Sequence, residues 1–324
     1  MRADSVGYSG LDFVVPSDSA DLPRSPCRAL HIGGTGTVVV DPADGKTTAV
    51  AIPVVAGETL RLQVKRVRKT GTTATRIMAA YGPITKRPPF APTDFQTLLL
   101  WNRSDKVTLA GNLVGTWPDL SGKGQDATAS GAQRPTWIAD AGNGQPGLVF
   151  DGSANLMTSA SILTLGGISQ LTVWFAGFGS VGATAEIIEY GPSVATIAGT
   201  WNLVVDANSA SDVQATTHGG ATIATEFFSP GTFAAPSFLV VTYDISTAGT
   251  QAVIRYNGAA VSTTHGGTAS TGAFIDNLVN YANRSGGSFL WKGTMQEVGI
   301  CTGLLSSSQI SQLETYLKSR YRSF

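Results

Sequence analysis

Residues 253–261 read Val-Ile-Arg-Tyr-Asn-Gly-Ala-Ala-Val, and this stretch decides the fold class of the larger part of the chain. Asn257-Gly258 favours the positive φ angles of a type I′ turn, which joins two antiparallel strands in a hairpin. Similar short β-prone runs recur on both sides of it between turn residues, at 147–150, 171–178, 186–190, 201–206, 238–244, 251–256, 259–264 and 293–301. The pattern predicts an all-β, two-sheet antiparallel sandwich.

The sequence predicts one helix, at the C-terminus. Ser306 and Gln309 have the spacing of a capping box, in which each side chain bonds the backbone of the other residue. Ile310, Leu313 and Leu317 then fall on one helical face. We expect that face to pack against the sandwich.

The sandwich region also carries an ordered set of short motifs. They are Trp101 to Asp105, Trp117 to Gly122, Arg134-Pro135-Thr136, Phe150-Asp151-Gly152, the Asn257-Gly258 hairpin and a tail from Gly293 to Tyr321. In this order they resemble the laminin-G/concanavalin-like jelly-roll domains of phage and bacterial surface proteins, over residues 93 to 321. The resemblance implies a domain that binds glycans or fills structural space.

A proline-rich stretch from Lys86 to Pro92 divides the 324 residues into two parts. Three prolines within five residues favour extended conformations and predict a short, semi-rigid spacer. The chain is neutral overall, but twelve Lys/Arg against seven Asp/Glu up to Pro92 leave +5, and the remainder carries −5. We therefore expect two domains, 1–90 and 91–324, with different partners or with faces that attract each other.

The first part predicts a small β domain. Its strand-like runs are 37–40, 48–55, 60–67 and 75–81. The run at 60–67 and the residues after it are basic, with a register slip expected near Lys65 and Arg66. We interpret five cations there as an attachment surface for an acidic partner, a solvated strand face being the alternative: Arg61, Lys65, Arg66, Arg68 and Lys69. Without interleaved aromatic residues or a known reading module, nucleic acid is not the expected partner.

The first part resembles a second family. The motifs are Asp21 to Arg24, Arg28 to Gly36, Val54 to Glu58, and Val64 to Ala74 followed by Ile77. In this order and spacing they are similar to the spike base proteins of gene transfer agents, the domesticated tailed-phage-like particles of alphaproteobacteria. The resemblance implies a virion attachment module on the particle surface that docks on a capsid or spike-fibre protein, as a homo-oligomer matched to a five-fold vertex.

Motifs for catalysis and metal binding are weak. Glu186 and Glu189 are the nearest candidates for the paired carboxylates of a glycoside hydrolase, but their odd spacing predicts opposite faces of a strand. Cys27 and Cys301 fall in different domains and lack the spacing of a zinc site. We expect no catalytic residue, metal or cofactor, and hence no enzyme.

Glycan binding calls for an exposed aromatic ring beside polar oxygens and amides. Trp201, Asn202 and Asp206 combine these groups near an expected sheet face, and His218 and His265 lie in glycine-rich loops. We take these five residues as the candidate glycan site. The other tryptophans are expected in the core: Trp101, Trp117, Trp137, Trp174 and Trp291.

The chain shows neither a secretory signal nor an apolar run of the roughly 20 residues that a membrane span needs. We expect it to fold in a bacterial cytoplasm and to function on a virion, without membrane insertion. The predicted function is structural and adhesive, with the second domain binding a host surface polysaccharide. The alternatives are a glycan-active enzyme on the same fold and a spacer with no ligand.

Overall fold

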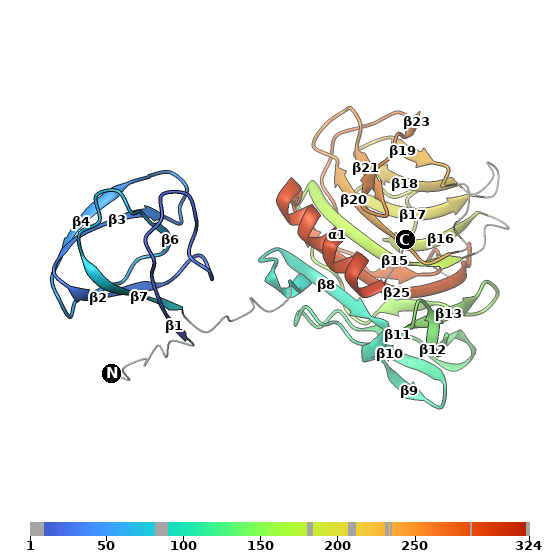
Figure 1. Ribbon diagram of the computed structural model, residues 1–324. Helices are drawn as coiled ribbons and strands as arrows, with labels where there is room; N and C mark the ends of the chain where they lie inside the picture. The colour runs from blue at the N-terminus through green and yellow to red at the C-terminus, as the bar shows by residue number, and fades with distance from the viewer. Residues whose placement is uncertain are drawn as a thin grey trace. The chain divides into compact units, whose positions relative to one another are not determined.

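The computed structural model describes residues 10–81, 90–179, 184–206, 212–230, 233, 235–285 and 287–321 (Figure 1). The chain forms two compact units, Met1–Pro89 and Phe90–Phe324. Each unit has its own buried core of hydrophobic residues. No helix among the described residues is long and apolar enough to cross a membrane.

The N-terminal unit consists of two small antiparallel sheets. The four-stranded sheet has the order β1 (Gly10–Phe13), β7 (Thr75–Tyr81), β2 (Ala29–Gly34) and β5 (Thr59–Leu60). The three-stranded sheet has the order β4 (Val50–Val54), β3 (Gly36–Pro42) and β6 (Val64–Val67). Apolar side chains from both sheets form the core, among them Leu30, Ile32, Val38, Val40, Val64 and Ile77.

The basic run of the N-terminal unit, expected as one strand with a register slip, is divided. Residues 60–67 form two separate strands, β5 and β6. Asp41 pairs with Arg66 while Pro42 pairs with Val64, so that Lys65 is the extra residue of a β-bulge. The slip expected near Lys65 and Arg66 is therefore confirmed.

The C-terminal unit is an antiparallel β-sandwich, which confirms the predicted fold class. In its first sheet, β25 (Lys292–Thr302) pairs on one side with β8 (Leu98–Arg103) and β13 (Gln145–Asp151). On its other side β25 pairs with β15 (Gln170–Gly179). The sheet then continues through β20 (Ser237–Asp244), β21 (Ala252–Tyr256) and β22 (Ala259–Ala260). Its second sheet runs through β10 (Leu113–Trp117), β11 (Ala127–Thr128), β14 (Met157–Ser159), β24 (Val279–Tyr281), β16 (Ala185–Tyr190), β17 (Thr200–Asp206), β18 (Asp212–His218), β19 (Ile223–Phe228) and β23 (Thr264–Gly267). The short strand β9 (Thr108–Ala110) pairs with β10. β12 (Thr136–Gly142) pairs mainly with β13 and at one position with β10, so it links the two sheets.

The predicted hairpin joins β21 to β22. Asn257 and Gly258 have φ angles of 51° and 83°, as a type I′ turn requires. The run expected at 259–264 is a strand only at Ala259 and Ala260, and β23 begins at Thr264. The local turn signal thus predicted the hairpin correctly, although the second strand is shorter than expected.

The predicted helix is α1 (Ser307–Tyr321), which lies along the outer side of the first sheet (Figure 1). The capping box is present, because the Gln309 amide N–H donates to Ser306 Oγ at 3.3 Å and the Ser306 amide N–H donates to Gln309 Oε1 at 2.9 Å. Leu313 and Leu317 are fully buried in the cluster beneath the helix, and Ile310 packs against it. Four of the tryptophans expected in the core are buried, and the fifth, Trp137, is half-buried.

A buried carboxylate fastens α1 to the sheet. Glu297 Oε1 accepts hydrogen bonds from the indole N–H groups of Trp101 and Trp174, at 2.9 and 3.0 Å. Its Oε2 accepts hydrogen bonds from the hydroxyls of Tyr316 and Tyr321, at 2.9 and 2.6 Å. Two strands and the helix therefore share one acceptor, and this accounts for a fully buried glutamate in an otherwise apolar layer.

Candidate functional site

A row of polar side chains crosses the second sheet on the face turned away from the core. Directly paired residues in antiparallel strands share a face of the sheet. The register pairs Asn280 with Glu189, Glu189 with Asn202, and Asn202 with Thr216, which pairs with Thr225. We call this row and its neighbours on the same side the outer polar face.

Glu186 lies on the outer polar face together with Glu189. Glu186 pairs with Val204 and Glu189 pairs with Asn202, and the register shift between them makes Ile187 the extra residue of a bulge. Because Asn202 and Val204 are two residues apart, they and their partners share one face. The expectation that the two glutamates lie on opposite faces is therefore wrong, and the bulge is the reason.

One guanidinium holds both glutamates. Arg284 Nη2 donates to Glu186 Oε1 at 2.6 Å, and Arg284 Nε donates to Glu189 Oε1 at 3.2 Å. Both carboxylates are buried, while the Arg284 side chain is 20% exposed and its guanidinium lies 4.2 Å from the ring centre of Phe289. Asn202 Nδ2 completes the cluster by donating to both oxygens of Glu186, at 3.1 and 2.9 Å.

The electrostatics of this cluster follow from its burial. Loss of solvation raises the pKa of Glu186 to about 8, with the nearby Glu189 carboxylate adding to the shift and Arg284 opposing it. Burial also raises the pKa of Glu189. One cation therefore faces two carboxyl groups, of which Glu186 is largely protonated at neutral pH.

The cluster has a geometry that differs from that of a glycoside hydrolase. Such enzymes hold two carboxyl groups roughly 5 to 10 Å apart on either side of an open space for the glycosidic bond. Here Glu186 and Glu189 are fully buried and bind the same guanidinium. Among the described residues, no group of three or more His, Cys, Asp or Glu side chains could hold a metal ion.

The outer polar face becomes accessible toward β19 and β23. A second row of paired residues crosses this face beside the first. In it Val204 pairs with Gln214, Gln214 pairs with Phe227, and Phe227 pairs with Thr264. Gln214, Phe227 and the adjacent Thr225 are half-buried, and Thr264 is exposed. We call these four residues the Phe227 patch, which combines an aromatic ring with an amide and two hydroxyls, the groups that sugars require.

Three of the predicted glycan residues are buried. Trp201 is fully buried, with its ring 5.8 Å from that of Tyr190 and 5.2 Å from that of Tyr243. Asn202 is buried beneath the Arg284 cluster, and His218 is buried with its Nδ1 2.8 Å from the carbonyl oxygen of Val194. The prediction of sugar contacts at Trp201, Asn202 and His218 is therefore wrong, because these side chains are shielded from solvent.

The other two predicted glycan residues are placed differently. Asp206 ends β17, and its side chain lies outside the described part of the structure. His265 Nδ1 lies 2.6 Å from Glu226 Oε1, and its side chain is 43% exposed. A sugar contact at His265 stays a prediction.

The sequence signal for the Phe227 patch is the alternation in β19. Thr225 and Phe227 point outward, and the residues that alternate with them along the strand are buried.

The basic residues expected to form an attachment surface are mostly engaged within the N-terminal unit. Lys65 and Arg66 bind Asp21, with N–O distances of 3.5 and 2.6 Å. Arg68 binds Asp41 at 2.7 Å, and its hydrogen bond holds the pKa of that carboxyl below its usual range. Within the described part of the unit no carboxylate pairs with the remaining two, Arg61 and Lys69. The five cations therefore do not form one free basic surface, because Asp21 and Asp41 neutralise three of them.

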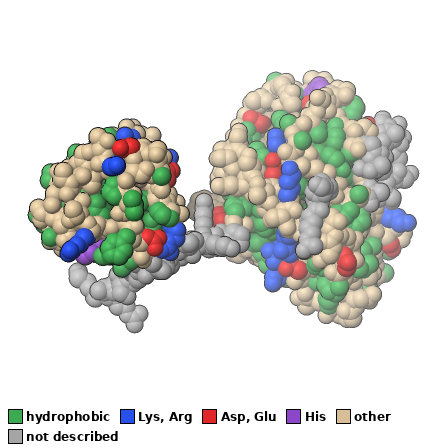
Figure 2. Space-filling model, in the orientation of Figure 1, with side chains coloured by type: hydrophobic (Ala, Val, Ile, Leu, Met, Phe, Trp, Pro, Cys, Tyr) green, Lys and Arg blue, Asp and Glu red, His purple; other side chains and the backbone are tan. Residues whose placement is uncertain are grey.

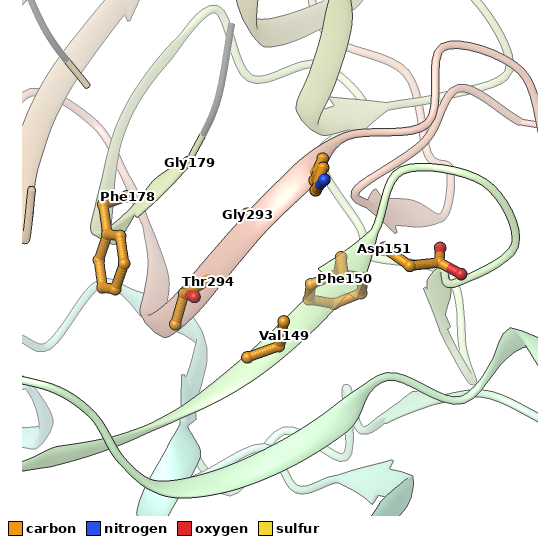
Figure 3. A pocket seen from close by; sticks show the side chains of 8 residues that line it. Val149, Phe150, Asp151, Phe178, Gly179, Gly293 and Thr294 are labelled. Atoms are coloured by element: carbon orange, nitrogen blue, oxygen red, sulfur yellow. The ribbon is translucent and has the colours of Figure 1, made fainter. Parts of the chain in front are cut away.

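The C-terminal unit also contains a pocket of about 530 Å³ (Figure 3). Phe178, Val149 and Thr294 line one part of it, and Asp151 lies at the other end. The Asp151 carboxylate accepts hydrogen bonds from the backbone of its own loop, at residues 153, 154 and 155, all at 2.9 Å. Although partial burial raises the pKa of Asp151, these bonds outweigh it and lower the pKa, so this carboxylate braces a turn. The lining contains two phenylalanine residues, Phe150 and Phe178, and three residues with polar side chains, Asp151, Lys292 and Thr294.

Comparison with known proteins finds likeness only among solved structures, because no family model and no curated protein matches the chain. A chain in the capsid of a native gene transfer agent (GTA) particle, in a structure computed with C5 symmetry, is 36% identical over 23% of this chain and 83% of that chain, with a TM-score of 0.21. The binding domain of botulinum neurotoxin serotype G is 12% identical over 68% of this chain, with a TM-score of 0.50, and a Trypanosoma rangeli sialidase is 17% identical over 74%, with a TM-score of 0.47.

This chain spans only part of these larger proteins. It covers 51% of the neurotoxin binding domain and 36% of the sialidase. At such low identity the neurotoxin likeness shows the β-sandwich fold alone.

Proposed function

We propose that this chain is a structural protein of a tailed-phage-like particle of the GTA type, where it forms part of a head spike. The N-terminal unit attaches the chain to the particle, and the C-terminal sandwich binds polysaccharide on the host cell surface. Two observations support the particle assignment: the ordered motifs between Asp21 and Ile77, and the 36% identity to a chain of a GTA particle capsid.

The Phe227 patch is the observation that carries the adhesive part of the proposal. A half-buried ring can stack on the apolar face of a sugar while Gln214, Thr225 and Thr264 bond its hydroxyls. A single patch of this size binds weakly. Several copies on one particle would raise the avidity by roughly 10²- to 10⁴-fold, provided that their geometry lets them engage together. We propose a homo-oligomer at a five-fold vertex as the arrangement that supplies those copies.

The proposed binding is non-catalytic and needs no cofactor. Glu186 and Glu189 are the two carboxyl groups nearest to a glycoside hydrolase pair, and the same cation holds both. For either to act as an acid or a base, Arg284 would have to leave and the covering side chains would have to move. A depolymerising enzyme on this fold is therefore the second candidate, and a spacer without a ligand is the third.

Incubation of the purified full-length chain with host capsular polysaccharide tests the proposal. We expect retention on the polysaccharide without any shortening of its chains, and at least a tenfold loss of retention in Phe227→Ala. Ile162→Ala is the matched control, because Ile162 is an exposed apolar residue of the same unit, 56% exposed, outside the patch. Depolymerisation would favour the enzyme, and absence of retention would favour the spacer.

A further inference from the structure

One face of the N-terminal unit exposes an apolar stripe on an edge strand. Leu11 and Phe13 of β1 are 56% and 77% exposed, and Val15 just beyond it is 87% exposed. Phe13 pairs with Met78 of β7, which is half-buried on the same face. We call this side of the four-stranded sheet the β1 face.

The β1 face is the outer side of its sheet. The alternate residues Val14, Ile32 and Ile77 turn inward and belong to the core cluster. The hydrogen bond from the Val14 N–H to the Ile77 carbonyl, at 2.9 Å, continues the register of β1 beyond Phe13. Edge strands usually carry charges or prolines that discourage pairing and association, so exposed apolar residues here point to a surface that a partner covers.

A strained arginine stands on the same face. Arg76 of β7 is exposed and has a φ angle of 52°, a left-handed conformation that is unfavourable for a non-glycine residue. Gly33 of the neighbouring strand makes room for it, because a Cβ at Gly33 would lie 2.6 Å from the Cβ of Arg76. The continued register places Arg76 beside Val15, so the strained backbone presents a cation next to the apolar stripe.

The charges indicate what kind of partner fits. The outward positions of the described sheet, on β1, β7, β2 and β5, include Arg76 and His31 and hold no acidic residue. Two copies of this unit that met through the β1 face would bring Arg76 and His31 together without a carboxylate, because a symmetric contact uses the same face of both copies. The complementary surface therefore belongs to a different protein.

We propose that the β1 face is the docking surface of the N-terminal unit, and that it binds a different protein of the particle on a surface where a carboxylate lies among apolar side chains. This inference rests on the proposed function and specifies the surface through which attachment occurs. Figure 2 shows hydrophobic side chains exposed on the visible surface of the N-terminal unit, beside both basic and acidic ones. The apolar stripe supplies the buried area, and Arg76 supplies the charge that fixes the orientation.

The test uses full-length protein and particles from cells that lack this chain. Wild-type protein is expected to sediment with the stripped particles. Phe13→Ser and Arg76→Gly should each reduce the bound fraction at least tenfold. Arg76→Gly removes the cation and also relieves the positive φ angle, so its melting temperature should equal or exceed that of the wild type. Val55→Ser and Lys46→Ala are the matched controls, since Val55 is 60% exposed and Lys46 is exposed outside the β1 face, and both should bind normally.

The outcomes separate the two proposals. If wild-type protein binds the particles and both face variants bind equally well, the docking surface is wrong while the proposed function stands. If wild-type protein does not bind at all, attachment to the particle is itself wrong, and the docking surface is overturned with it. If the face variants bind normally but have a lower mass in sedimentation equilibrium than the wild type, the β1 face joins copies of this chain, which overturns the assignment to a different protein.

Discussion

Arg284 Nη2 donates a hydrogen bond to Glu186 Oε1 at 2.6 Å, although the two residues are 98 positions apart in the chain. The bond ties the segment after β24 to β16 and places a cation over a buried carboxyl pair. Together with the bond from Arg284 Nε to Glu189, it holds both carboxyl groups in place on the outer polar face, where they are shielded from solvent. Four predictions concern this cluster, the Glu297 network and the Phe227 patch.

Arg284→Leu is expected to lower the free energy of unfolding by about 3 to 5 kcal/mol, because it leaves buried carboxyl groups without their cation. The measurement is urea unfolding at pH 8, where a substantial fraction of Glu186 is ionised. Arg134→Leu is the control, since the Arg134 side chain donates only to the carbonyl of Gly131 among the described contacts, and it should change the value by less than about 1 kcal/mol. Equal stability of the two variants would show that the Arg284 cluster is not structural.

Glu186→Gln is expected to flatten the dependence of stability on pH. The pKa of Glu186 is raised to about 8 in the folded state, above its unfolded value of 4.5. A raised pKa means that its contribution is fully present below pH 4.5 and is lost as the pH rises through about 8. The free energy of unfolding of the wild type should therefore fall relative to that of the variant between pH 5 and pH 8. A difference that stays constant or grows over this range would contradict the burial of this carboxyl.

Glu297→Ala is expected to loosen α1 and to lower the free energy of unfolding by at least about 3 kcal/mol. It leaves two indole and two phenol donors without their shared acceptor, and each buried unsatisfied group costs about 1 to 3 kcal/mol. Amide hydrogen exchange in residues 307–321 reports the loosening directly. Glu314→Ala, which removes an acceptor from α1 that binds Arg255, should have the smaller effect. Exchange rates as slow as those of the wild type would rule out the fastening role.

Trp201→Ala and Phe227→Ala are expected to separate stability from sugar binding. Removal of the fully buried Trp201 should cost about 3 to 5 kcal/mol of folding free energy, whereas Phe227→Ala should cost less because that side chain is only half-buried. Polysaccharide retention per folded molecule should fall only in Phe227→Ala. A loss confined to Trp201→Ala would instead support the interpretation drawn from the sequence.

Local signals allowed the sequence to predict much of the fold. The Asn257-Gly258 turn and the Ser306 cap depend on neighbouring residues, and both are present in the structure. Runs of β-prone residues between turn residues likewise predicted several strands of the sandwich, namely β13, β15, β16, β17, β20, β21 and β25, but not β8, β18 or β19. The short strands β1 and β2 were not predicted, because their alternating pattern is broken by small residues.

The candidate site was harder to predict, because its features depend on distant partners. The bulge at Ile187 arises only from pairing with β17, and no property of residues 186–189 alone reveals it. The burial of Trp201 depends on Tyr243, which lies on the other sheet. The basic residues of the N-terminal unit are neutralised by partners such as Asp21, which is 45 positions from Arg66. Sequence patterns show residue types, whereas these contacts require the tertiary fold.

Attachment of particles to encapsulated host cells tests the proposed function most directly. Particles carrying the full chain should be compared with particles carrying a chain that lacks residues 93–324, after mass spectrometry has shown that the shortened chain is incorporated. Loss of all sandwich copies removes their combined avidity, so we predict that attachment falls at least tenfold, while particle number and DNA content stay unchanged. Attachment at the full level by particles that carry the shortened chain would show that the sandwich is not the adhesive part.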